Sequence, residues 1–270
     1  MRIYNNRVIS YFFWRFILRN PRLRIFLTNL LVADEDVNVA LFGSSVCVNK
    51  RKEIGYINAY DSSKSSIVFR DESGSLINLA LILEPTDTFV DIGANVGLYS
   101  SVISKLIYVY PQMNFYAFEA NPDTARRLRK SLEGRNVKIY DFALSNKECE
   151  LEFVQGATSG VFGAKNHASD FQVANNTQII KAKTLDSVGI IGDSIILKID
   201  VEGHEREVIE GATGLINDGR IKAIYLDGFN DEKLPDELKS KGFILFDGRT
   251  LKPLTVVQPS LLAIHKRYVV

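Results

Sequence analysis

The chain has 270 residues and a formal charge of +1, from 33 Lys and Arg against 32 Asp and Glu. Its 46% hydrophobic and 24% charged residues are typical of a globular protein and exclude a disordered, collagen-like or coiled-coil chain. The near-neutral balance argues against a protein that coats nucleic acid, because such binding needs clustered cations. Cys47 and Cys149 lie far apart without a ligand spacing, which predicts neither a disulfide framework nor a zinc site and fits a reducing, cytoplasmic setting.

Residues 1–33 form a basic, aromatic-rich N-terminal segment. They contain no acid and six arginines, which are Arg2, Arg7, Arg15, Arg19, Arg22 and Arg24. The apolar stretch 8–18 is interrupted by Arg15 and is shorter than the roughly 18 residues that span a bilayer. We expect a helix here, with two placements open: packed on its own domain, or lying on an anionic membrane surface as a peripheral contact.

Between Gly43 and Phe69, short apolar runs alternate with turn residues. This pattern predicts strands or a small antiparallel ribbon. We therefore divide the chain into an N-terminal helical and short β extension, residues 1–85, and a main domain, residues 86–270.

The main domain shows apolar runs separated by helical stretches, which is typical of a parallel sheet covered on both faces. The predicted strands are 88–92, 114–118, 137–140, 194–199 and 221–226. The predicted helices are 96–106, 122–132, 204–211 and 232–241. The sequence thus predicts a doubly wound α/β domain, in which 156–176, rich in Gly, Ala, Ser and Asn, is a mobile substrate loop.

A glycine-containing turn follows the predicted strand 88–92. Gly93 permits a tight turn close to a ligand, and Gly97 removes a side chain where a helix approaches. No Lys-Ser or Lys-Thr follows, which excludes a triphosphate-binding loop, and the spacing also departs from the dinucleotide fingerprint. Asp91 and Asn95 favour a ligand with an ammonium group. The alternative is an ordinary turn without a ligand.

The next two strands also end in acids. Glu119 follows Gly93 by 26 residues and can accept both hydroxyls of an adenosyl ribose, although an acid here can instead cap the following helix. Asp141 and Phe142 follow strand 137–140 and can hold the amino group and face of an adenine. The alternative for Asp141 is a solvated turn acid.

The densest titratable cluster follows strand 194–199. Asp200 closes the strand, and Glu202 and His204 lie just beyond it, so each is a candidate general base. His204 has the ordinary pKa that best suits a base at neutral pH. Glu205 enters the first turn of the next helix, where an acid complements the helix dipole. Adjacent residues point apart and no second ligand cluster is present, so we predict no metal.

Together, four motifs resemble the FkbM-type S-adenosylmethionine-dependent methyltransferases. They are residues 91–97 with Tyr99, 117–122, 143–145 and 197–205, the last followed by 210–212. Ala120 stands where the family usually has proline. The resemblance implies a Rossmann-like, mostly parallel sheet of the class I methyltransferase type. It also implies S-adenosylmethionine as cofactor and O-methylation of a sugar, glycan or secondary-metabolite hydroxyl.

The resemblance also implies roles for individual residues. The cofactor would be bound by Asp91, Gly93, Asn95, Gly97, Tyr99, Glu119, Asp141 and Phe142. The base would be one of Asp200, Glu202 and His204. We expect the loop 156–176 to close over the acceptor, with Thr158, Ser159 and Asn166 binding its hydroxyls.

Two other functions remain as alternatives. A nicotinamide-dependent oxidoreductase or epimerase uses the same sheet and ribose acid, but the chain lacks its glycine fingerprint and a Tyr-x-x-x-Lys pair. A non-catalytic membrane-surface adaptor would use the basic N-terminus alone. The intact motif acids argue against it.

Overall fold

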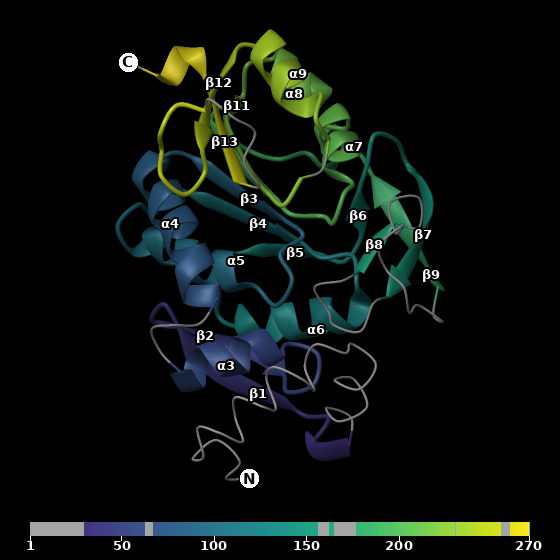
Figure 1. The fold of residues 1–270 in the computed structure, drawn as a ribbon. Coiled ribbons are helices and arrows are strands. Elements are labelled where there is room, and N and C mark those ends of the chain that lie inside the picture. The colour runs from purple at the N-terminus through teal and green to yellow at the C-terminus, as the bar shows by residue number, and fades with distance from the viewer. Residues whose placement is uncertain are drawn as a thin grey trace.

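The computed structural model describes residues 30–62, 67–155, 162–164, 177–229, 231–254 and 260–269. Their largest element is a seven-stranded sheet with helices on both faces (Figure 1). Its spatial order is β12 (Phe243–Asp247), β13 (Ser260–His265), β11 (Ile221–Asp227), β10 (Ile195–Ile199), β3 (Thr88–Ile92), β4 (Asn114–Phe118) and β5 (Lys138–Tyr140). In this sheet β13 alone runs antiparallel to its neighbours. The predicted doubly wound α/β fold is therefore confirmed.

The predicted helices of the main domain are also present. They are α5 (Leu98–Ile103), which continues as the 3-10 helix η2 (Ser104–Tyr108), α6 (Pro122–Ser131), α7 (Glu205–Glu210) and α9 (Leu234–Ser240). A further short helix, α8 (Thr213–Asn217), follows α7. Helices α7, α8 and α9 cover one face of the sheet, and α5 packs on the other face with α4 (Ile67–Ile82).

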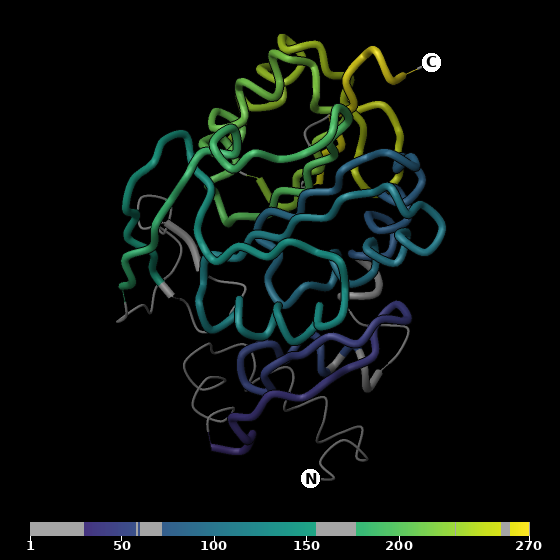
Figure 2. The backbone as a smooth tube through the Cα atoms, turned by 180° about the vertical axis from the view of Figure 1, so that it is seen from behind, coloured from purple at the N-terminus to yellow at the C-terminus, as the bar shows by residue number. Residues whose placement is uncertain are grey.

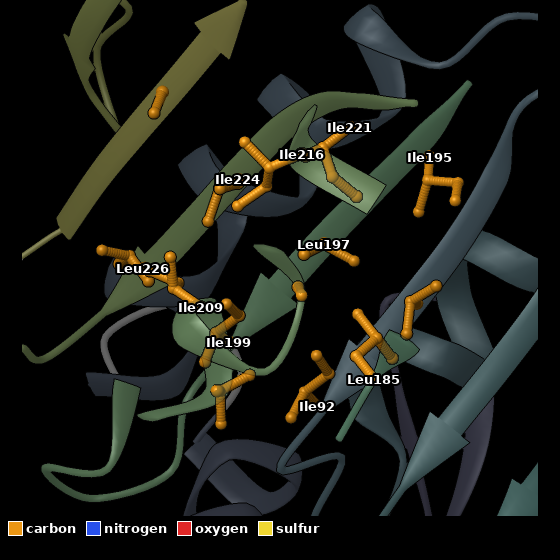
Figure 3. Packing of buried hydrophobic residues seen from close by; sticks show 14 of the residues in the cluster. Ile92, Leu185, Ile195, Leu197, Ile199, Ile209, Ile216, Ile221, Ile224 and Leu226 are labelled. Carbon is orange, nitrogen blue, oxygen red and sulfur yellow. The ribbon is translucent and has the colours of Figure 1, made fainter. Parts of the chain in front are cut away.

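The main core lies between the sheet and helices α7 to α9. Figure 3 shows side chains of Ile92 from β3, Leu197 and Ile199 from β10, and Ile224 and Leu226 from β11 in this layer. Every residue of β3 and β10 is buried. Parallel strands covered on both faces read as nearly continuous apolar runs, which explains why the sequence pattern located them.

The N-terminal extension begins with the predicted antiparallel ribbon. It is a hairpin of β1 (Asp36–Leu41) and β2 (Ser44–Asn49), followed by helix α3 (Ile54–Ser62). The expectation of strands as far as Phe69 is wrong, because residues 67–69 begin the 16-residue helix α4. A short β-branched run cannot be distinguished from a helix start by periodicity alone, and the apolar spacing of Leu76, Leu79 and Leu83 further along is helical.

The hairpin docks on the main domain beneath α6, as both views of the chain show (Figures 1 and 2). The Ser44 hydroxyl donates to the carbonyl of Ser101 at 2.9 Å, and the Cys47 amide donates to Ser131 Oγ at 2.8 Å. Residues 1–29, including most of the predicted N-terminal helix, lie outside the described residues.

A second sheet is inserted between β5 and β10. It contains β6 (Ala143–Leu144), β7 (Cys149–Gln155), β8 (Phe162–Ala164) and β9 (Thr177–Lys183), in the order β6-β9-β7-β8. The substrate loop expected at 156–176 therefore contains a strand, because β8 pairs with β7. The rest of that loop lies outside the described residues.

Among the residues that the structure describes, no helix combines the length and the apolar character needed to cross a bilayer.

Candidate active site

The site lies where the chain reverses its path across the sheet. From β3 the chain builds β4 and β5 on one side, and β10 and β11 lie on the other. Ligands of open α/β sheets bind in the crevice at the carboxyl ends of such strands. A cleft that opens to solvent lies there. It is lined by Ile92, Gly93, Asn95, Phe118, Glu119, Ala120, Phe142, Ala143, Leu144, Phe153, Asp200, Val201, Glu202 and His204.

The glycine turn after β3 forms one edge of this cleft. The amides of Gly93 and Ala94 donate to the Phe118 carbonyl at 3.0 and 2.8 Å, which joins the turn to β4. Gly93 has a φ of 72°, and a Cβ there would lie 1.8 Å from the Asp200 carbonyl oxygen. Gly97 lies at the start of α5, where a Cβ would lie 2.6 Å from Leu128 of α6. Gly93 thus shapes the cleft, whereas Gly97 allows two helices to pack.

Asn95 lines the cleft in a left-handed conformation, with a φ of 52°. Its amide donates to Glu119 Oε2 at 2.8 Å. Its side-chain Oδ1 is buried and accepts no hydrogen bond from any described residue. Backbone strain and an unpaired buried acceptor both cost free energy, and such features gather at ligand sites.

Glu119 is buried at the end of β4, and both of its oxygens face backbone amides. Oε1 accepts from the Asn121 amide at 2.8 Å, and Oε2 accepts from Asn95. Burial raises the pKa of Glu119 to about 7, although these two hydrogen bonds act in the opposite direction. The cap of α6 is Asn121, whose side chain accepts from Asp123 and Thr124. Each Glu119 oxygen keeps a second lone pair that can accept from a ligand hydroxyl.

Asp91 and Tyr99 lie behind the cleft rather than in its lining. Asp91 is fully buried, and its Oδ2 accepts from the amide and hydroxyl of Ser100 at 3.1 and 2.6 Å. The Tyr99 hydroxyl donates to Glu72 of α4. Burial, opposed by that hydrogen bond, raises the pKa of Glu72 to about 7. Asp91 therefore holds the start of α5, and Tyr99 joins α5 to α4.

An apolar slot lies beside Glu119. Phe142 lines it and meets Phe118 edge-on, with ring centroids 5.7 Å apart. Phe153 reaches the same slot from β7 of the inserted sheet. Sequence reasoning missed Phe153, and its only signal was the alternation of apolar residues in 149–155. Asp141 is placed elsewhere, because its carboxylate pairs with Arg129 at 2.9 Å outside the lining.

The three candidate bases all line the cleft. The Asp200 side chain is 41% exposed. Glu202 has a φ of 54°, and burial together with the Asp200 charge raises its pKa to about 7. His204 is buried, with Nε2 3.0 Å from Ser145 Oγ and Nδ1 3.5 Å from Glu207. Glu205 turns away from the cleft and accepts from the Gly203 amide at 3.0 Å.

Lys198 was missed by sequence reasoning. It lies inside β10, is 3% exposed, and contacts Asp91, Asp200 and the Gly93 carbonyl. The sequence did contain a signal, because a lysine within an otherwise apolar predicted strand indicates a buried charge that needs acidic partners.

Thr158, Ser159 and Asn166 lie outside the described residues, so the structure places none of the predicted acceptor contacts. Within the described ranges, no three His, Cys, Asp or Glu side chains are arranged to hold a metal ion.

A family model described as the methyltransferase FkbM domain matches residues 91–245. The hexuronic acid methyltransferase AglP of Haloferax volcanii is 25% identical over 177 residues, which are 64% of this chain and 70% of that protein. A precorrin-6y C5,15-methyltransferase structure from Geobacter metallireducens is 16% identical with a TM-score of 0.39, over 76% of this chain and 92% of that one. A TehB-like methyltransferase structure from Corynebacterium glutamicum is 11% identical with a TM-score of 0.42, over 77% and 92%.

Proposed function

The chain belongs to the FkbM-domain family of methyltransferases, and from that premise we propose that it O-methylates a hydroxyl of a sugar, glycan or secondary metabolite. Its cofactor is S-adenosylmethionine. The hexuronic acid methyltransferase of Haloferax volcanii supports a sugar-containing acceptor. The observation that carries the proposal is one cleft that contains both Glu119, from the end of β4, and the Asp200 and Glu202 carboxylates that follow β10.

The residues of the cleft fit this cofactor. The acidic side chains in the lining are Glu119, Asp200 and Glu202, and no lysine or arginine is among the described lining residues. An acidic cleft attracts the two cationic groups of S-adenosylmethionine, which are its sulfonium and the ammonium of its methionyl end. The unpaired Asn95 oxygen offers an acceptor to an ammonium donor.

Each part of the cleft has a proposed binding role. Glu119 accepts hydrogen bonds from the ribose hydroxyls, and the Phe142 and Phe153 side chains enclose the adenine. Asn95 and the Gly93 turn hold the methionyl end. Asp91, Gly97 and Tyr99 contribute indirectly, by fixing the turn and the start of α5.

Bound S-adenosylmethionine supplies a methyl group on a positively charged sulfur, open to in-line displacement by an oxygen nucleophile. The chain must therefore hold an acceptor hydroxyl in line and exclude water. We assign Glu202 as the base that takes the hydroxyl proton, because it lines the cleft beside Asp200 and burial raises its pKa to about 7, near neutral pH. Such assistance typically contributes about 10²- to 10⁴-fold in rate. Asp200 lies beside it, and His204, held against Ser145, supports the same loop.

Calorimetric titration with S-adenosylmethionine and S-adenosylhomocysteine tests the cofactor site. We expect Glu119→Ala to lose about 1 to 3 kcal/mol of binding free energy, the usual loss when buried polar groups lose a partner. Glu133→Ala, at an exposed position beyond α6, is the matched control and should bind as the wild type does. A folded wild type that binds neither compound would refute the proposal.

The acceptor is tested by supplying neutral hexosides, hexuronides and hydroxylated metabolites with isotope-labelled cofactor. A product that keeps its methyl group through mild alkali is an ether formed on a hydroxyl. A product that loses its methyl group is an ester formed on a carboxylate. This result would contradict a hydroxyl acceptor and show that the acceptor group is a carboxylate.

We also infer that residues 1–33 make a peripheral membrane contact, supported by their six arginines and aromatic side chains. Flotation of the full chain with anionic vesicles tests this. A full-length variant with these arginines replaced by glutamine should stay at the bottom of the gradient. Failure of the wild type to float contradicts the inference.

A further inference from the structure

Lys198 carries a charge in the middle of the sheet. It is 3% exposed and lies in β10 between Leu197 and Ile199, which face the core shown in Figure 3. Its own side chain extends to the opposite face, beside Tyr99 of α5, whose ring centroid is 5.2 Å from Nζ. Burial of an ammonium group is unfavourable unless charged or polar partners compensate for its lost hydration.

The ammonium has partners on three segments that the sequence separates. Nζ donates to the Gly93 carbonyl at 3.0 Å. It also lies 3.4 Å from Asp91 Oδ1 in β3 and 3.5 Å from Asp200 Oδ2 at the end of β10. An ammonium has three donors and no acceptor, which suits three oxygens arranged around it. One cation thus joins the end of β3, the glycine turn and the end of β10.

We propose that Lys198 is a positioning residue for methyl transfer, whose ammonium fixes the glycine turn and the Asp200 carboxylate relative to each other. This rests on the proposed function of the cleft. Lys198 does not line the cleft, so it acts through Gly93 and Asp200, which do. The two edges of the cleft come from strands that are neighbours in space but about 100 residues apart in sequence. The Asp200 amide still pairs with the Ile92 carbonyl at 3.0 Å, so Lys198 orients the Asp200 side chain rather than its backbone.

Carboxylates from four neighbouring segments act on the charge of Lys198, whereas α5 contributes only the uncharged Tyr99 ring. Asp91 in β3, Asp200 after β10, Asp227 in β11 and Glu72 in α4 face it. Burial lowers the pKa of Lys198, but these carboxylates outweigh that effect and raise it above the ordinary value. Lys198 is therefore charged throughout the working pH range.

The same charge acts on Glu202. Burial, and then the charges of Asp200, Glu205 and Asp227, raise the pKa of Glu202, while Lys198 lowers it. Removal of the Lys198 charge should therefore move the ionisation of Glu202 to still higher pH. This effect does not require bound cofactor, so it can be measured on the protein alone.

Lys222 provides a matched control. It is also a buried lysine in a central strand, and its Nζ pairs with Asp87 at 2.9 Å and Glu84 at 3.0 Å. It lies at the amino end of β11, whereas the cleft lies at the carboxyl ends of the strands. Lys222→Met removes a buried charge of the same kind without touching the cleft.

The test is an NMR titration of glutamate labelled at the side-chain carboxyl, with Glu202→Gln used to assign the Glu202 signal. We expect a midpoint near pH 7 in the wild type. In Lys198→Met it should move up by about one pH unit, the usual lower range for loss of an opposite charge. Lys198→Arg, which keeps the charge, should restore the midpoint, and Lys222→Met should leave it unchanged.

The same variants, titrated with S-adenosylhomocysteine, test positioning separately from charge. Lys198→Arg should bind S-adenosylhomocysteine about tenfold more weakly at every pH, because a forked guanidinium does not fit among oxygens arranged around a compact ammonium. Wild-type affinity in Lys198→Arg would overturn the proposal, and this variant remains informative if Lys198→Met does not fold. An unmoved Glu202 midpoint in folded Lys198→Met, or an equal shift in Lys222→Met, would also overturn it. If the wild type bound no cofactor at all, the proposed function would fail instead, while the NMR result would stand.

Discussion

Arg127 of α6 and Glu53, just before α3, form an ion pair of 3.0 Å in which each side chain is only 1% exposed. The pair crosses the boundary between the N-terminal extension and the main domain. Arg127 also contacts Asp123 at 2.9 Å on its own helix. The extension is thus fastened to the helix whose first turn follows Glu119.

Breaking this pair should destabilise the protein strongly. We expect Arg127→Met to lower the free energy of unfolding by about 3 to 5 kcal/mol, because it leaves the buried Glu53 carboxylate without its cation. Glu53→Gln should cost less, because Arg127 keeps its ion pair with Asp123. Urea unfolding of the two single variants and of the double variant measures these changes in the free energy of unfolding. If the double variant lost as much free energy of unfolding as the two single variants together, the two side chains would not be coupled.

Gly93 should tolerate no side chain. Gly93→Ala places a Cβ 1.8 Å from the Asp200 carbonyl, so we expect loss of cofactor binding and a lower melting temperature. Gly134→Ala is the control, because Gly134 has a similar φ of 74° but nothing within 4 Å of the added Cβ. Gly134→Ala should lower the free energy of unfolding by only about 1 to 2 kcal/mol, the penalty for a side chain in a left-handed backbone conformation. Equal effects of the two changes on cofactor binding would contradict this account.

Glu119 should make stability depend on pH. Its pKa rises from an ordinary 4.5 to about 7 on folding, so the unfolded chain loses this proton first as pH increases. The folded state binds more protons between these values, and stability therefore falls as pH rises from about 4.5 to about 7 and then levels off. Glu119→Gln should make this fall in melting temperature across pH less steep, while Glu72 and Glu202, whose pKa values are also raised to about 7, keep the remainder. A fall as steep as in the wild type would show that other groups cause it.

Phe153 should contribute an aromatic face to cofactor binding. Phe153→Leu keeps most of the apolar volume but removes the ring, and we expect S-adenosylhomocysteine to bind about three- to tenfold more weakly. Leu151→Ala is the control, because Leu151 packs in the same small cluster of the inserted sheet but does not line the cleft. Calorimetric titration with S-adenosylhomocysteine compares the affinities of the two variants. Weaker binding in Leu151→Ala alone would assign the effect to the sheet rather than the ring.

The central strands β3, β4, β10 and β11 could be predicted because they are buried on both faces. The bounds predicted for β3 and β4 match those of the structure. The inserted strands and the edge pair β12 and β13 were not predicted. Strands β6 and β8 are too short to show a periodic pattern, and β12 lies at the edge of the main sheet and is only partly buried, unlike a central strand.

The site could be predicted in part. Strand ends located Glu119, Asp200 and Glu202, since parallel strands bring their carboxyl ends to one edge. The same reasoning could not separate Asp91, which is buried beneath the turn, from residues that line the cleft. It also could not find Phe153, which reaches the cleft from a strand outside the main sheet.

The inserted sheet does not set the register of the strand that leads to Asp200. Strand β10 pairs with β3 and β11, so none of its register depends on β7, β8 or β9. The insert shares a wall with the cleft through Phe153 and Ala143. Changes of length between β7 and β9 can therefore accumulate during divergence without altering the pairing of β10, the strand that ends next to Asp200.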